Sequence, residues 1–209
     1  MPRIEPFERY PYKYDQWFIR NEYAYKSELL AINKKLPRSK NGIEIGVGSG
    51  RFAAPLGIKL GVEPSSKMRM LSKNRKIDLI DSIAENLPFR SFIFDFVLLV
   101  TTICFIDDIE VAFKEIFKIL KPEGILIIGF IDRNSEIGKL YEKHKQSNVF
   151  YSIADFYSVK EVISFLSKAK FQNFNFCQTI FHPLSVINKI ERVKKGYGKG
   201  SFVVIKAQK

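Results

Sequence analysis

The chain has 209 residues, of which 46% are hydrophobic and 27% are charged, and its net charge is +12. This length and balance suit one α/β domain with a sizeable core and exclude a disordered chain. No run of about 18 apolar residues predicts a membrane span, and the first residues lack an apolar signal core. We therefore expect a cytoplasmic protein, monomeric or dimeric, with no membrane partner.

The positive charge and the small number of cysteines and histidines limit which macromolecular partners and metal sites we expect. Lysine-rich clusters are dispersed and no nucleic-acid-binding module is recognisable, so a nucleic-acid partner is less favoured than a lysine-rich solvated surface of the kind found in thermophiles. Cys104 and Cys177 lie far apart in apolar sequence, and the two histidines are not close together. We therefore expect free thiols and no metal site.

The first 40 residues predict an arm and a helix that precede the main domain, residues 41–209. Residues 1–14 are rich in Pro, Tyr and Arg and predict an irregular arm, and apolar positions at helical spacing predict a helix over about 21–35. The aromatic residues Tyr14, Trp17 and Tyr25 are candidates for a lid that excludes water from a reaction site. A patch that packs the helix onto a sheet explains them equally well.

A pattern typical of nucleotide binding follows. A strand over 42–45 leads into a glycine-rich turn with Gly46, Gly48 and Gly50. A helix-like segment over 51–56, a second strand over 58–62 and the acid Glu63 follow it. Glycines let a ligand lie against the backbone, and the helix would point its free N–H groups at the ligand. An acid at the tip of the second strand is placed to accept hydrogen bonds from both hydroxyls of a ribose.

The spacing of this pattern separates two cofactor families. A dinucleotide site requires Gly-x-Gly-x-x-Gly, whereas this chain has Glu-x-Gly-x-Gly-x-Gly beginning at Glu44. A carboxylate at the mouth of the loop would repel a pyrophosphate and hold a cationic amino-acid group. The sequence therefore predicts a site for S-adenosylmethionine, and a turn that binds no ligand is the simpler alternative.

The motif from Glu44 to Gly50, followed by Gly61-Val-Glu-Pro-Ser65, resembles the first two motifs of class I S-adenosylmethionine-dependent methyltransferases. Residues 84–89, 91–97 and 119–126 resemble later motifs of the type 11 subgroup, which includes ubiquinone and menaquinone biosynthesis enzymes. The whole chain is also similar to small thermophilic methyltransferases labelled histamine N-methyltransferase-like. The resemblance implies a Rossmann-like, seven-stranded, mostly parallel sheet with helices on both faces and an antiparallel last strand pair.

The same resemblance implies S-adenosyl-L-methionine as cofactor, S-adenosyl-L-homocysteine as product, and a set of residues that contact them. These residues are Glu44, Gly46, Val47, Gly48 and Gly50 in the first motif, Glu63 and Pro64 in the second, Ile83, Ala84 and Glu85 around the adenine, and Val100, Thr101 and Thr102 near the methyl group. The family often has Asp or Asn where this chain has Ile83, so backbone groups and apolar contact would hold the adenine. The alternatives are that Glu85 supports a turn and that the two threonines are ordinary loop residues.

The rest of the chain predicts the remaining elements of a doubly wound fold. We expect a helix over 65–74 with a cap at Ser65 or Ser66, one from a cap at Asp107 to 120, one over about 136–146, and one from a capping box at Ser158 and Glu161 to about 168. We expect strands over 77–80, 95–100, 125–131, 173–181 and 201–206. Residues 121–124 predict a tight turn. Asp132 ends a strand on the substrate side, and the insertion at about 134–157 lies where this fold carries substrate pockets.

These features predict transfer of a methyl group to a small-molecule acceptor by in-line displacement. Methylation of a protein or RNA acceptor, or binding of the cofactor without catalysis, are the alternatives. A general base is optional for such a reaction. Four residues, Asp107, Asp132, His144 and His182, could serve as one, and the sequence does not choose among them.

Overall fold

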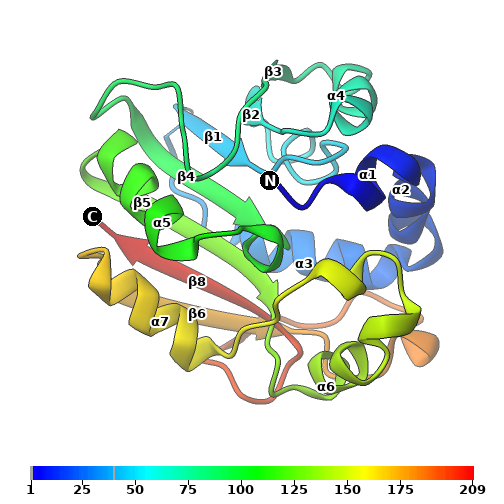
Figure 1. Cartoon of the computed structure of the whole chain (residues 1–209). Helices are drawn as coiled ribbons and strands as arrows, with labels where there is room; N and C mark the ends of the chain where they lie inside the picture. The colour runs from blue at the N-terminus through cyan, green and yellow to red at the C-terminus, as the bar shows by residue number, and fades with distance from the viewer. Residues whose placement is uncertain (1, 40) are drawn as a thin grey trace.

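The computed structural model describes residues 2–39 and 41–209. Eight strands form one sheet in the order β3-β2-β1-β4-β5-β8-β6-β7 (Figure 1). The strands are β1 (Gly42–Ile45), β2 (Leu60–Val62), β3 (Asp78–Ile80), β4 (Phe94–Val100), β5 (Leu120–Ile131), β6 (Gln172–Thr179), β7 (Lys194–Lys195) and β8 (Phe202–Gln208). The first five run parallel, and β8 runs antiparallel between β5 and β6.

The predicted fold class is confirmed, with one strand more than expected. The additional strand, β7, is a pair of lysines bonded to the edge of β6 opposite Cys177 and Gln178. Two lysines carry no apolar pattern, so periodicity could not indicate this strand. The antiparallel pair predicted near the end of the chain is β6 with β8.

Helices cover both faces of the sheet (Figure 1). They are α1 (Glu5–Arg9), α2 (Pro11–Arg20), α3 (Glu22–Asn33), α4 (Ser66–Lys73), α5 (Ile109–Ile119), α6 (Glu136–Lys143) and α7 (Val159–Lys168), with short 3-10 turns at Ile103–Phe105, Lys145–Ser147, Tyr151–Ile153 and Leu184–Val186. One core cluster joins α5 and α7 to one sheet face, and a second joins α3 to the other. In the part of the chain described above, no helix is long and apolar enough to cross a membrane.

The N-terminal arm is helical, which corrects the expectation of an irregular segment. Pro6 and Pro11 each stand within the first two positions of a helix, α1 and α2. A proline there needs no hydrogen-bond donor and already has the helical φ, so it starts a helix instead of breaking one. The helix predicted over about 21–35 is α3.

The glycine-rich turn is not followed by a regular helix, contrary to the prediction. Residues 51–57 form consecutive turns with isolated bonds from Ala54 N to Gly50 O and from Leu56 N to Phe52 O. Pro55 has no N–H to donate to the next carbonyl, so the helical ladder is interrupted after one turn.

Two boundaries on the α5 side also differ from the prediction. Asp108 caps α5 by accepting hydrogen bonds from the N–H groups of Glu110 and Val111, while the neighbouring Asp107 pairs with Arg3. The tight turn expected at 121–124 is absorbed into β5, where the pairing with β4 shifts register between Phe94 and Phe96. The capping box of α7 at Ser158 and Glu161 is present as predicted.

Candidate active site

The glycine-rich turn lies at the carboxyl ends of β1 and β4, where the strand order reverses. Gly46 and Gly48 have φ values of +68° and +55°, which side chains rarely tolerate. A Cβ on Gly46 would lie 2.2 Å from Thr102 Cγ2, so the turn packs directly against the end of β4. Opposite Gly48 the nearest atom to such a Cβ is 3.6 Å away, which leaves the backbone accessible there.

Glu63 follows β2 and faces the same turn. Its Oε2 accepts a hydrogen bond from Gly48 N at 2.8 Å, and its Oε1 accepts one from Ser65 N at 2.9 Å. Burial raises the pKa of Glu63 to about 7, although these two hydrogen bonds favour the charged form. The carboxylate is thus held between the turn and the start of α4, at the place where the sequence predicted a ribose acceptor.

Glu44 lies beneath the turn and not at its mouth. The residue is 1% exposed, and a hydrogen bond from the backbone of Ala53 reaches its carboxylate. Its Oε2 is buried, and none of the residues that the structure describes forms a hydrogen bond with it. Burial is the main reason that its pKa lies well above the usual value. A buried acid with one unused oxygen marks a position where a cationic or hydrogen-donating group could be accepted.

A cavity of about 90 Å³, here called the small cavity, opens beside Glu63. Ten of the predicted cofactor residues line it, namely Gly46, Gly48, Glu63, Pro64, Ile83, Ala84, Glu85, Val100, Thr101 and Thr102. Three others do not: Glu44 is below the turn, Val47 is buried against Gly61, and Gly50 lies against Ile77 and Ser72. Residues of the arm, including Pro2, Arg3 and Phe7, cover the cavity.

A second, larger cavity of about 340 Å³ lies between α2, α3 and the insertion at 134–157. Eleven of the 23 described residues that line it are aromatic, and they include Trp17, Phe52, Tyr141, Phe150 and Tyr151. The insertion therefore forms part of a pocket, in the position that the sequence suggested. Cys104 also lines it, and burial raises the pKa of that thiol to about 12.

Three residues line both cavities: Tyr14, Thr101 and Phe105. Tyr14 is hydrogen-bonded to the side chain of Thr101, and burial raises its pKa. Thr101 has a φ of +51°, an unusual value for a β-branched residue. The two cavities therefore meet at the end of β4, with the Tyr14 ring between them.

Two predicted lid or substrate residues have other contacts. The hydroxyl of Tyr25 donates to Arg51 O at 2.5 Å, and the ring packs on Phe18 and Phe52. Asp132 is buried and accepts a hydrogen bond from Asn134 N at 3.1 Å, outside both cavities. None of the four candidate bases lines either cavity.

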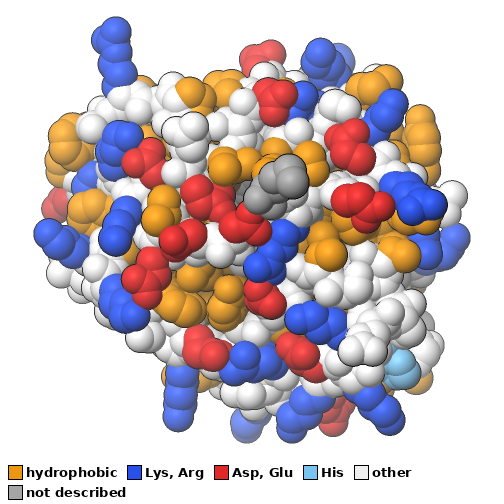
Figure 2. Space-filling model, in the orientation of Figure 1, with side chains coloured by type: hydrophobic (Ala, Val, Ile, Leu, Met, Phe, Trp, Pro, Cys, Tyr) orange, Lys and Arg blue, Asp and Glu red, His pale blue; other side chains and the backbone are white. Residues whose placement is uncertain are grey.

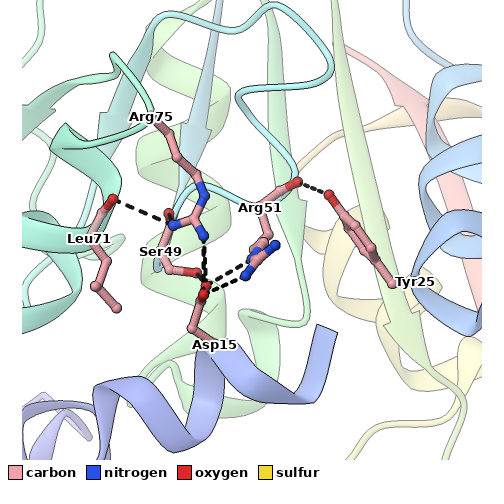
Figure 3. Close-up of polar contacts among 6 residues, drawn as sticks. All are labelled: Asp15, Tyr25, Ser49, Arg51, Leu71 and Arg75. Atoms are coloured by element: carbon pink, nitrogen blue, oxygen red, sulfur yellow. Dashed lines mark hydrogen bonds and ion pairs between the residues drawn. The ribbon is translucent and has the colours of Figure 1, made fainter. Parts of the chain in front are cut away.

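The arm is fastened to the glycine-rich turn through Asp15 (Figure 3). Arg51 donates to Asp15 at 2.8 and 2.5 Å, Ser49 Oγ donates at 2.7 Å, and Arg75 donates at 3.1 Å. Burial alone would raise the pKa of Asp15, but the hydrogen bonds from Arg51 and Ser49 and the nearby positive charges lower it to about 2. We call this group of four residues the Asp15 clasp.

Two further polar contacts hold the arm. Arg3 bridges Asp107 at 3.0 Å and Asp155 at 2.6 Å, so it joins the arm to the insertion. Glu8 accepts hydrogen bonds at the start of α4, from Ser66 Oγ at 3.1 Å and Lys67 N at 3.3 Å. The arm thus spans the openings of both cavities.

Glu28 lines the larger cavity, although it is not among the site residues predicted from the sequence. A signal was present, because Ala24 and Ala31 lie four residues before it and three after it. That spacing places all three on one helix face, and all three are buried.

Comparison with known proteins agrees with this geometry. A family model described as a methyltransferase domain matches residues 43–128. The chain is 44% identical to an uncharacterised protein of Methanocaldococcus jannaschii over 97% of this chain and 98% of that one. It is 48% identical to a Thermotoga maritima protein solved as a SAM-dependent methyltransferase, possible histamine N-methyltransferase, with a TM-score of 0.94 and 97% of each chain covered.

A more distant structure shares the fold alone. The phosphoethanolamine N-methyltransferase 2 of Haemonchus contortus, solved with S-adenosylhomocysteine, is 16% identical, with a TM-score of 0.64 over 97% of this chain and 59% of that one. The motif, the fold and the relatives of high identity agree. The chain belongs to the S-adenosylmethionine-dependent methyltransferases.

Proposed function

We propose that this enzyme transfers the methyl group of S-adenosylmethionine to a small-molecule acceptor held in the larger cavity. The observation that carries this proposal is the junction of the two cavities at Tyr14 and Thr101. A cofactor beside Glu63 and an acceptor among the aromatic side chains would meet there. Enclosure on this scale suits a small molecule, since binding pockets for such ligands measure about 300–1,000 Å³.

The residues beside the small cavity fit the cofactor. Glu63 offers two carboxylate oxygens to ribose hydroxyls, and Ile83 and Ala84 offer apolar contact to the adenine. Glu44 does not line this cavity, so it would support the turn from below. When bound, S-adenosylmethionine supplies a methyl group on a positively charged sulfur. The protein's own task is then to align the acceptor and exclude water, which Tyr14 and the rest of the arm would do.

The arm acts in this proposal as a lid. The small cavity, at about 90 Å³, is well below the size of a pocket that encloses a nucleoside-sized ligand. Pro2, Arg3 and Phe7 take up the remaining space above it. We therefore expect the arm to move outward when the cofactor enters and to close again over it.

Calorimetric titration with S-adenosylmethionine, S-adenosylhomocysteine and NAD tests the cofactor site. We expect micromolar binding of the first two and none of NAD. Methyl-labelled cofactor incubated with a cell lysate then tests the acceptor class. Label in the low-mass fraction supports the proposal, and label in protein or RNA contradicts it. Binding without transfer to any fraction would identify a non-catalytic binding protein.

The net charge of +12 is the one feature that favours a macromolecular acceptor. On the face shown in Figure 2, however, Lys and Arg side chains are interspersed with Asp and Glu. A nucleic-acid footprint requires basic residues gathered on one face or along one stripe. The surface in this view therefore supports the small-molecule proposal.

A further inference from the structure

A buried carboxyl group that no other described residue pairs with lines the larger cavity. Glu28 belongs to α3 and is 4% exposed. Within residues 2–39 and 41–209, no hydrogen bond or ion pair reaches its carboxyl group, and burial is the sole cause of its shifted pKa. Its neighbour Ser27 is fully engaged, donating to Tyr23 O and accepting from Glu191 N. The lack of a partner is therefore specific to the residue that faces the cavity, since the neighbouring polar side chain on α3 is paired.

Such an arrangement is unfavourable unless something else completes it. A buried carboxylate loses its hydration and gains nothing in return. Desolvation raises the pKa of Glu28 to about 8, so near neutral pH the empty cavity holds mainly the protonated acid. The protonated form still has an O–H group for which the described residues provide no acceptor. Buried polar groups are normally paired, which makes an unpaired one in a cavity wall a candidate for contact with a ligand.

The aromatic side chains of the cavity also favour a ligand that carries a positive charge. Tyr141 and Tyr151 are stacked with ring centroids 4.2 Å apart, and both are close enough to interact electrostatically with Glu28. Trp17 and Phe52 also line the cavity. Aromatic faces attract cations, and the attraction grows when the cation is desolvated. A carboxylate and several rings around one space thus favour a positively charged nitrogen.

Other titratable groups line this cavity, and two of them have the opposite charge. Lys13 and Arg20 belong to α2 and are exposed to solvent at its outer side. Arg20 also donates to Gln16 Oε1 at 2.9 Å. Water and salt screen such exposed charges strongly, whereas Glu28 is screened little. The inner end of the cavity is therefore governed by Glu28, with the neutral groups of Tyr14, Cys104, Tyr141, Tyr151 and Tyr157 as the remaining titratable side chains in the lining.

We propose that Glu28 pairs with a positively charged amino group of the methyl acceptor, and that the acceptor of this enzyme is therefore an alkylamine or an arylalkylamine. This inference rests on the proposed function, because it assigns the larger cavity to the acceptor. It adds the chemical class of the acceptor and the residue that selects it.

Three matched probes test the proposal: 2-phenylethylamine, 2-phenylethanol and 3-phenylpropanoate, which are cationic, neutral and anionic. Trp17 is the single tryptophan of the chain and lines the cavity, so its fluorescence reports binding. In the wild type we expect the amine to bind at least about tenfold more tightly than the alcohol, as a charge-assisted hydrogen bond provides. Equal binding of amine and alcohol, or tighter binding of the anion, would overturn the proposal.

Glu28→Gln should abolish the preference for the amine while leaving the affinity for the alcohol unchanged. Glu22→Gln is the matched control, because Glu22 lies on the same helix but pairs with Lys26 at the surface. A preference that survives in Glu28→Gln contradicts the assignment. Thermal melting verifies that both variants fold.

A measurement on the wild type alone keeps the test independent of any variant. If the ammonium group pairs with the ionised form of Glu28, amine binding near neutral pH releases about one proton, and alcohol binding releases none. Calorimetry in two buffers of different ionisation enthalpy measures this number, and amine binding without proton release speaks against the pair. Titration with S-adenosylhomocysteine in parallel separates the two proposals: if it binds while the amine does not, only the inference about Glu28 fails.

Discussion

The Asp15 clasp is the contact whose removal should loosen the arm most. In the structure, the pKa of Asp15 falls from 3.8 to about 2. A difference of about 1.8 units corresponds to about 2.5 kcal/mol of stabilisation. Solvent reaches Asp15 and both arginines, with side-chain exposures of 15%, 22% and 24%, and screens part of this energy. We therefore expect Asp15→Asn to lower the free energy of unfolding by about 1–2 kcal/mol at neutral pH.

Urea unfolding measures this loss, and limited proteolysis after Lys13 and Arg20 measures the detachment of the arm itself. The pKa of Asp15 is depressed on folding, so its contribution is complete above pH 3.8 and disappears as the pH falls through about 2. Glu5→Gln is the control, because the Glu5 side chain is 74% exposed and pairs with Arg9 on the same helix. If Asp15→Asn is no less stable and no more readily cleaved than this control, the clasp does not hold the arm.

Three further predictions concern the cavities. Glu63→Gln should weaken S-adenosylhomocysteine binding by about 10- to 100-fold, since hydrogen bonds to a charged acceptor contribute about 1.5–3 kcal/mol. In the wild type, the affinity measured by calorimetry should rise by up to about tenfold between pH 6 and 8, because a carboxyl group with a pKa of about 7 ionises in this range. Unchanged affinity in the variant would refute its role. Gly46→Ala should lower the free energy of unfolding, measured with a denaturant, by about 2–5 kcal/mol, because the residue has a positive φ and its new methyl group would clash with Thr102. Gly57→Ala is the control: Gly57 has a φ of +75° but open space around it, so the loss should be only about 1–2 kcal/mol. Equal losses would show that packing against Thr102 is unimportant. The pKa of Glu28 is raised on folding from 4.5 to about 8, so the free energy of unfolding of the wild type should fall by up to about 5 kcal/mol as the pH rises from 4.5 to 8. The fall should be smaller in Glu28→Gln, and parallel pH profiles of the two proteins would argue against a buried unpaired acid.

Local signals in the sequence predicted much of the structure. The strand, glycine turn, strand and acid between Gly42 and Glu63 form as expected, because alternate glycines and short apolar runs act within a few residues. The caps at Ser65 and Ser158 are also present, since each cap bonds only to its own helix. Such features depend on nearest neighbours, and their chemistry is visible in the chain.

The rest depended on contacts between distant residues. The local sequence does not distinguish a tyrosine that holds a loop in place, as Tyr25 does, from a tyrosine that lines a pocket. The composition of residues 1–14 predicts an irregular arm, although Pro6 and Pro11 occupy the first turns of helices. Glu28 received no role because its significance comes from the absence of a partner, and only the arrangement of α2, α3 and the insertion defines that absence.

The polar contacts of the arm have a consequence for how the protein is made. Arg3 bonds to Asp107 and Asp155, which follow it by 104 and 152 residues. At synthesis rates of about 5–20 residues per second, the second partner leaves the ribosome about 8–30 s after Arg3. The Arg3 contacts must therefore wait for most of the chain, whereas the Asp15 clasp needs nothing beyond Arg75. A nascent chain with the clasp already formed would still leave the first residues of the arm unfastened, so the ligand could reach the small cavity before this end of the arm closes over it.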